Sequence, residues 1–289
     1  MENQTVANIE TAISYIEEHL DRKLDLDEVA EGVHFSKYYL HRMFTSTVGM
    51  TIHDYSVRRR LTEAAKLLVF SERPVIEIAL TCGYESQQSF TAAFKSMYKF
   101  PPAKYRERRE FYPLQLRFSL HREMDGTSFS KDRIRAANMD DIPAWMELVS
   151  SIIDGFPCLN EEQYGETLIN FIQMDQALII KHEDTAIGVM CFSYETGNIE
   201  FLGIHPQYRN CGLQKDFLDK LMGEYLPGHE ISITTYREGD RADTGYRKQL
   251  KQLGFAEREL LLEFGYPTQR FVLPPIKQEV HSNAENISP

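Results

Sequence analysis

Two stretches in the first third of the chain share one pattern of apolar and polar positions: a short helix, a tight turn, and a second helix that begins with polar residues. In the later stretch, Ser86 is suited to cap a helix that runs to about Tyr98, where Pro101 and Pro102 stop it. The apolar positions recur at helical spacing and predict a buried stripe. The stripe consists of Phe90, Ala93, Phe94 and Met97.

The opposite face of this helix is polar from its first turn, with Gln87, Gln88, Thr91 and Lys95. Glutamine can pair with adenine in the major groove, threonine can bond a base or touch a thymine methyl, and lysine can reach a phosphate. An ordinary amphipathic helix with a solvated face fits the same pattern. This helix by itself leaves both interpretations open.

The earlier stretch repeats the design after an amphipathic helix at residues 5–20. Asp25 and Glu28 form a capping-box pattern for a short helix that Gly32 closes. Ser36 then caps a helix with Tyr39, Leu40, Met43 and Phe44 facing inward. Its outward face carries Lys37, Tyr38, His41 and Arg42, which is typical of a helix-turn-helix.

A long helix that starts after Thr51 connects the two units. We expect its Arg58, Arg59 and Arg60 to belong partly to a solvated face, with one of them on a DNA phosphate. Two helix-turn-helix units on a stiff connector place two recognition helices about 34 Å apart, one turn of DNA. The repeat therefore favours DNA binding over the solvated-face interpretation.

Residues 5–110 resemble the AraC/XylS DNA-binding domain, and SQQSFTAAFKSMYKFPPAKYR is especially similar to its MarA/SoxS/Rob branch. Ala92 stands where that branch often has an arginine, and Phe100 stands where glycine commonly precedes the prolines. Both departures suggest a different target sequence or a weaker second unit. The resemblance implies base contacts from Tyr38, His41, Arg42, Gln87, Gln88 and Thr91. Together with Ser36, Lys37, Ser86 and Lys95 at the two polar helix faces, these residues form the predicted DNA-contact set.

The chain changes character after residue 110. FYPLQLRFSL alternates like a strand, and turn residues follow, so we place a linker at 111–131. Strands and helices then alternate through residues 132–274, which predicts an α+β domain with a mixed, mostly antiparallel sheet. Residues 275–289 are polar and are expected to be disordered. The fold class is thus an all-α double helix-turn-helix domain (1–110) followed by an α+β domain.

The chemical signal of the second half is the turn from a strand that ends near Ile204 into a helix. Such a turn aims backbone N–H groups and the positive helix end at one point, which suits a pyrophosphate. A plain turn fits equally well. The predicted binding set is Ile204, Arg209, Asn210, Cys211, Gly212, Leu213 and Gln214.

Residues 133–265 resemble a GNAT acetyltransferase, through PQYRNCGLQ at the acetyl-CoA loop and KQLGF at a helix-to-strand turn. The resemblance implies acetyl-CoA as a cofactor. Gln214 replaces the small residue that lets the pyrophosphate approach, and Leu250 replaces the tyrosine that protonates the thiolate. Glu200 as base and Tyr246 as acid are the remaining catalytic candidates. No histidine near Cys211 in the sequence is positioned to activate it, so Cys211 is interpreted as a loop thiol.

The net charge of −11 divides unevenly: residues 1–112 carry −1 and residues 113–289 carry −10. One basic face in the first half therefore remains compatible with DNA. The four cysteines have no metal-ligand spacing, so no metal site is expected. The N-terminus lacks signal-peptide character and no apolar run spans a membrane, so we expect a cytoplasmic protein.

Two functions follow. The first is a transcription regulator that reads a specific operator in double-stranded DNA and whose second domain senses a small-molecule effector or acyl-CoA. The alternative is an active N-acetyltransferase, with an amine or antibiotic substrate, that carries a DNA-binding domain. Gln214 and Leu250 favour the sensor. Assembly as a homodimer and a purely dimerising role for the second half remain open.

Overall fold

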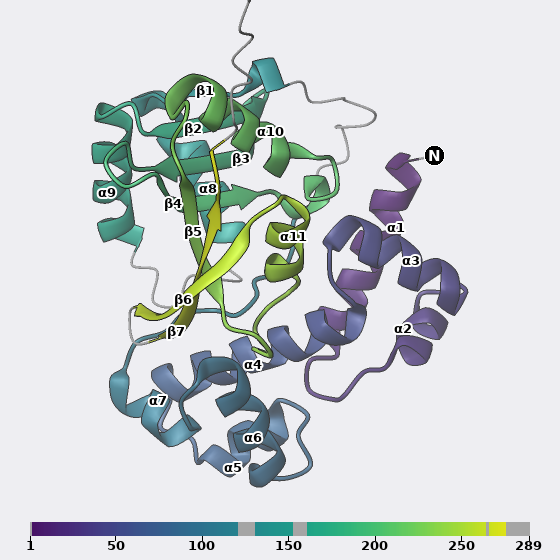
Figure 1. Cartoon of the computed structure of the whole chain (residues 1–289). Coiled ribbons are helices and arrows are strands. Elements are labelled where there is room, and N and C mark those ends of the chain that lie inside the picture. Colours follow the sequence, from purple (N-terminus) through teal and green to yellow (C-terminus); the bar gives the residue numbers. More distant parts are fainter. Residues whose placement is uncertain (1, 121–130, 153–160, 264–265, 276–289) are drawn as a thin grey trace, which may run out of the picture.

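The computed structural model describes residues 2–120, 131–152, 161–263 and 266–275. Its first part is helical: α1–α3 form one group, α5–α7 form a second, and α4 joins them (Figure 1). This arrangement confirms the predicted pair of helix-turn-helix units on one connector. The helices are α1 (Glu2–Glu18), α2 (Leu26–Gly32), α3 (Lys37–Val48), α4 (Ile52–Phe70), α5 (Val75–Thr81), α6 (Gln87–Tyr98) and α7 (Pro102–Arg108).

The helix starts follow the caps in the sequence. The Asp25 side chain accepts from the Glu28 backbone N–H, and Glu28 reaches back to the Asp25 N–H, which completes a capping box for α2. The Ser36 hydroxyl accepts from Tyr39 N–H at the start of α3, and Ser86 does the same for α6. These side chains satisfy N–H groups that have no partner within the helix, so the polar starts of α3 and α6 are fixed locally.

Each group has its own core. Leu40 and Phe44 of α3 are fully buried in the first, and Phe90 and Phe94 of α6 are fully buried in the second. Tyr39, which the sequence placed inward, lies at the edge with 37% of its surface exposed. The connector contributes side chains to both cores, so burial of apolar surface holds the two units on one rod.

Residues 111–120 correct one prediction. Their alternation indicated a strand, but the structure gives this segment no strand pairing. Tyr112 and Leu114 pack into the second helical core, and Phe118 and Leu120 pack into the first. The hydroxyl of Thr62 on α4 accepts from the backbone N–H of Leu114, in place of a neighbouring strand. The alternating apolar residues of this segment therefore pack against the helices and not within a sheet.

The three consecutive arginines of α4 correct a second prediction: none forms a solvated face. Arg58, Arg59 and Arg60 are only 2%, 6% and 4% exposed. Arg59 makes a two-pronged pair with Glu17 of α1, at 2.8 Å for each prong, and Arg60 donates to the backbone oxygen of Cys82 at 2.9 Å. Buried guanidinium groups need such acceptors. These arginine side chains therefore form hydrogen bonds within the protein.

The second part is a seven-stranded sheet in the order β1-β2-β3-β4-β5-β7-β6, antiparallel except between β4 and β5. This sheet confirms the predicted α+β half. The strands are β1 (Arg135–Ala136), β2 (Ala177–His182), β3 (Thr185–Phe192), β4 (Asn198–Ile204), β5 (Ile231–Tyr236), β6 (Ala256–Glu263) and β7 (Tyr266–Leu273).

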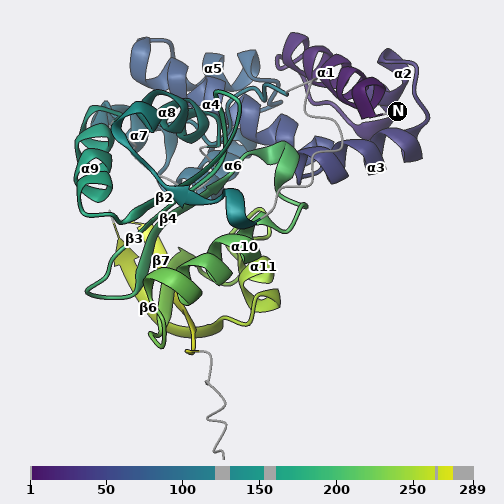
Figure 2. The same cartoon turned by 90° about the horizontal axis from the view of Figure 1, so that it is seen from above.

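Helices cover both faces of this sheet: α8 and α9 lie on one side, and α10 and α11 on the other (Figure 2). Asp141 stands just before α8. Its two carboxylate oxygens bond Arg135, and this interaction lowers the pKa of Asp141 to about 2. The helical elements are η1 (Lys131–Arg133), η2 (Met139–Asp141), α8 (Ile142–Ser151), α9 (Glu161–Gln173), η3 (Pro206–Tyr208), α10 (Leu213–Lys220), η4 (Leu221–Tyr225) and α11 (Tyr246–Gln252).

Three predicted features fall wholly or mostly outside the described residues. They are the later part of the 111–131 linker, Cys158, and the tail at 275–289 except residue 275. Of the other cysteines, Cys82 and Cys191 are buried, and Cys211 is exposed. Among the described helices, none combines the length and apolar character needed to cross a bilayer. The described residues also contain no cluster of three or more His, Cys, Asp or Glu side chains that could hold a metal.

Candidate functional site

The polar faces of α3 and α6 are open to solvent. Tyr38 is 86% exposed, Arg42 and Gln87 are also exposed, and Thr91 is half-buried. A set of these polar side chains makes no hydrogen bond or ion pair with any other described residue: His41, Arg42, Gln87, Gln88 and Lys95. Donors and acceptors that stay unsatisfied in the protein are available to bases and phosphates.

The basic residues of the helical half differ in what they already bind. Lys37, a predicted DNA contact, pairs with Asp27 at 2.6 Å, and Lys99 pairs with Asp240 of the sheet half at 2.7 Å. Arg42 and Lys95 have no such partner in the described part of the chain. Arg42 belongs to α3 and Lys95 to α6, so each helix-turn-helix unit has an exposed cation without an ion pair in the described part of the chain.

The turn after β4 carries the chemical signal of the sheet half. Gly212 adopts φ +81° immediately before α10, and a side chain there would meet no heavy atom within 4 Å. The backbone conformation, and not crowding, therefore favours glycine. Arg209 is half-buried, and Asn210 and Cys211 are exposed at the tip. Burial raises the pKa of Tyr208, so that hydroxyl remains neutral.

Strands β4 and β5 are in register only at their first two residue pairs, Asn198 with Ser232 and Ile199 with Ile233. Beyond these pairs the parallel strands part. At the end of the parting strands, Gln214 on α10 donates from Nε2 to Oε1 of Gln249 on α11, at 3.1 Å. Gln214, which stands where the GNAT-like sequence pattern has a small residue, thus connects the helix after β4 to the helix after β5.

The predicted catalytic pair is not brought to one place. Glu200 on β4 is exposed and accepts from Asn198 Nδ2 at 2.9 Å. Tyr246 begins α11 and lines a cavity that Glu200 does not line. Leu250 is buried in the core, 5% exposed.

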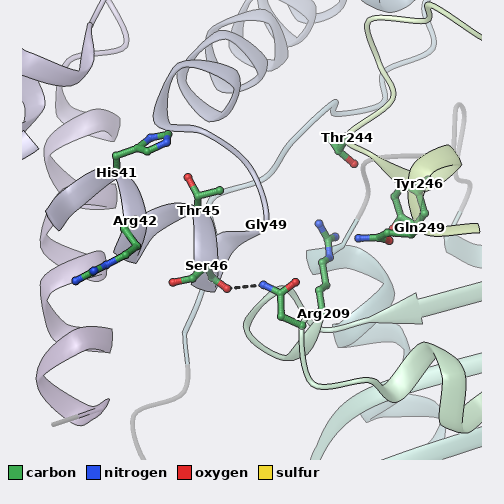
Figure 3. Close-up of a pocket in the computed structure, with 10 residues that line it drawn as sticks. His41, Arg42, Thr45, Ser46, Gly49, Arg209, Thr244, Tyr246 and Gln249 are labelled. Atoms are coloured by element: carbon green, nitrogen blue, oxygen red, sulfur yellow. Dashed lines mark hydrogen bonds between the residues drawn. The ribbon is translucent and has the colours of Figure 1, made fainter. Parts of the chain in front are cut away.

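That cavity, about 500 Å³ in volume, lies between the two halves of the chain (Figure 3). The Asn210 Nδ2 donates to the backbone oxygen of Ser46 at 2.6 Å, and the Arg209 side chain passes Gly49 at the end of α3. One wall is helix α3, and the opposite wall is the turn with α11. The lining residues are His41, Arg42, Thr45, Ser46, Gly49, Arg209, Asn210, Thr244, Tyr246 and Gln249.

The segment between β5 and α11 joins the halves at two further points. Arg58 of α4 donates to the Ala242 backbone oxygen at 2.6 Å, and Asp240 accepts from Lys99 at the end of α6. Asp240 also accepts from Tyr266 Oη, which fixes it to β7. The sheet half therefore contacts both helix-turn-helix units and the connector.

Sequence reasoning missed this junction. It treated the α3 face and the 205–212 turn as separate sites, and it did not single out Thr45, Ser46, Thr244 or Gln249. No local signal marks these residues, because Ser46 and Asn210 are 164 positions apart.

Comparisons with known proteins agree with the helical geometry. A family described as a helix-turn-helix domain matches residues 29–108. The regulatory protein SoxS of Escherichia coli K12 is 42% identical over 100 residues, which are 35% of this chain and 94% of SoxS. The right origin-binding protein of the same strain is 39% identical over 109 residues, 38% of each chain.

The chain therefore belongs to the AraC-type family of helix-turn-helix regulators. It is a DNA-binding transcription regulator of the same kind as SoxS, as the resemblance in the sequence indicated.

For the C-terminal region, a solved GNAT-family acetyltransferase from Bacillus cereus ATCC 10987 aligns with a TM-score of 0.40 and 15% identity. The alignment covers 50% of this chain and 97% of that protein. The glycine turn before α10 and the diverging strands β4 and β5 are observed directly in this chain and do not depend on that alignment.

Proposed function

We propose that the regulator reads one specific operator with α3 and α6 together, and that its sheet half senses a phosphate-bearing small molecule of the acyl-CoA type. The proposed DNA recognition rests on a contrast between polar side chains that already have partners in the protein and polar side chains that have none among the described residues. Arg42 and Gln87 face solvent without a partner in the described chain, whereas Arg58, Arg59 and Arg60 are buried. Arg42 supplies a bidentate contact to guanine, and Gln87 supplies one to adenine.

The operator would be found by selection from a random duplex library with the full chain. Gel-shift titrations of the selected duplex then compare wild type with Arg42→Ala and Gln87→Ala. Each variant loses discrimination at one base position in a different half of the site. Unchanged discrimination in both would reject α3 and α6 as the reading helices.

The sensor part is supported by the turn at 205–212. The eight-residue helix α10 directs its first N–H groups toward the tip, and Arg209 adds a cation beside them. Calorimetric titration of the full chain with acetyl-CoA tests this part. Absence of heat and of thermal stabilisation would remove the acyl-CoA ligand and leave DNA recognition intact.

Three observations favour a sensor over an N-acetyltransferase. Glu200 lies outside the cavity, Leu250 cannot donate a proton, and Gln214 and Gln249 bridge the helices that follow the parting strands. A sensor needs ligand-dependent DNA affinity and no turnover. Release of free thiol from acetyl-CoA with an amine panel, lost in Glu200→Gln, would reverse this choice.

A further inference from the structure

The cavity between the halves has a composition that its surroundings do not share. Residues 113–289 carry a net charge of −10, yet among the described residues no aspartate or glutamate lines this cavity. Arg209 extends into the space between Thr45 and Gln249, with the Gln249 amide turned toward it (Figure 3). A cationic wall without carboxylates suits a ligand that presents several anionic oxygens.

Both walls of the cavity add hydrogen-bonding groups to this arginine. His41 and Thr45 come from α3, and Thr244 and Tyr246 come from the sheet half. Within the described chain, Thr45 Oγ1 is buried without a hydrogen-bond partner. That oxygen is closed to solvent, so a ligand oxygen in the cavity can accept from it only after the Thr45 side chain rotates.

The polar face of α3 is also the face proposed to read DNA. His41 and Thr45 are one helical turn apart on the polar face, and Arg42 extends from that face away from Arg209 (Figure 3). The major groove is about 12 Å wide, which admits a helix but not a helix with a ligand packed on it. A molecule held between Arg209 and α3 therefore occupies space that the duplex needs.

We propose that this cavity binds the phosphate groups of a nucleotide-type ligand, gripped by Arg209 on one wall and α3 on the other, and that ligand and operator DNA exclude each other. This inference rests on the proposed sensing of an acyl-CoA-type ligand, and it assigns the direction of the response: the ligand releases DNA. By linkage, DNA lowers ligand affinity by the same factor.

Fluorescence anisotropy of the selected operator with the full chain tests the direction. Saturating acetyl-CoA is expected to weaken operator binding on the order of 10-fold, within the range of ordinary allosteric couplings. S-acetylpantetheine carries the same thioester without the phosphates and should have no effect. Calorimetry with and without operator should give the same factor for acetyl-CoA affinity.

Two variants locate the effect. Arg209→Gln is expected to bind acetyl-CoA more weakly and to lose the release of DNA. Lys215→Gln removes an exposed cation of α10 that is paired with Asp219 and lies outside the cavity, and it should respond as wild type does. Thermal melts of both variants would verify that they are folded.

The outcomes separate the two proposals. Binding of acetyl-CoA with no change in operator affinity would overturn mutual exclusion and leave the sensing proposal standing. No binding of acetyl-CoA at all would overturn both. Loss of ligand-free operator affinity in Arg209→Gln, with a weaker salt dependence, would assign the cavity to a DNA phosphate and overturn the exclusion.

Discussion

The two reading helices, α3 and α6, begin alike and end differently. Both follow a serine cap and expose polar residues in their first turns. At its C-terminal half, α3 forms a wall of the cavity and accepts a hydrogen bond from Asn210. The end of α6 is held through Lys99 and Asp240, and none of the polar contact residues of α6 lines the cavity. Among the described residues, the sheet half therefore contacts the polar face of α3 in the first unit and the end of α6 in the second.

The consecutive arginines of α4 show how this asymmetry is maintained. Arg59 binds α1 of the first unit, Arg60 binds the turn of the second unit, and Arg58 binds the sheet half. One turn of one helix thus holds three parts of the protein in fixed relation. Under the proposed function, a rigid connector of this kind lets a change beside α3 affect the DNA site that α3 and α6 read together.

The largest expected effect comes from breaking the first unit at its buried ion pair. Arg59→Ala leaves the largely buried carboxylate of Glu17 with the Tyr55 hydroxyl but without its cation, and should lower the free energy of unfolding by about 3–5 kcal/mol. Urea denaturation followed by circular dichroism measures it. Arg42→Ala, at an exposed position, should change stability by less than about 0.5 kcal/mol. Equal effects of the two variants would contradict the assignment of Arg59 to the scaffold.

Specific recognition by the first unit is expected to depend most on Arg42. Arg42→Ala should weaken operator binding by about 1–3 kcal/mol and relax one base position. Competition gel shifts with single-base operator variants measure both quantities. Lys66→Ala removes an exposed cation of α4 and serves as the control, because it should leave the base preference unchanged.

The link between the second unit and the sheet half should have a smaller effect. Lys99→Met removes the ion pair with Asp240, and because Lys99 is partly exposed the cost should be about 1 kcal/mol. Lys95→Met on the same helix has no ion pair among the described residues and should cost less. Thermal melts of both variants give the comparison, and a larger loss for Lys95→Met would refute the role of Lys99.

The second unit can also be strengthened. Ala92 is exposed on α6, and Ala92→Arg gives this helix a second long cationic donor beside Lys95. We expect a modest gain in affinity, with the slope of log K against log salt steeper by about 0.9 for one added phosphate contact. Operator titrations at several salt concentrations measure this slope. An unchanged slope would place residue 92 away from the DNA backbone.

Local patterns in the sequence were sufficient for the helical half. The caps at Asp25, Ser36 and Ser86 and the apolar stripes of α3 and α6 involve residues no more than a turn or two apart. Such signals act within one helix, so they determine helix starts and which face is buried. The order of strands and helices in the sheet half was readable for the same reason.

Tertiary structure decided the rest, because periodicity identifies a buried face but not what covers it. The alternation at residues 111–120 fitted a strand until the helical cores proved to be its partner. Arg58 could be buried only because the Ala242 carbonyl, 184 positions away, accepts its hydrogen bond. The cavity has the same origin, since α3 and the 205–212 turn meet only in the folded chain. The sequence by itself determined a reader of DNA, and the fold placed a ligand-sized space against one of its two reading helices.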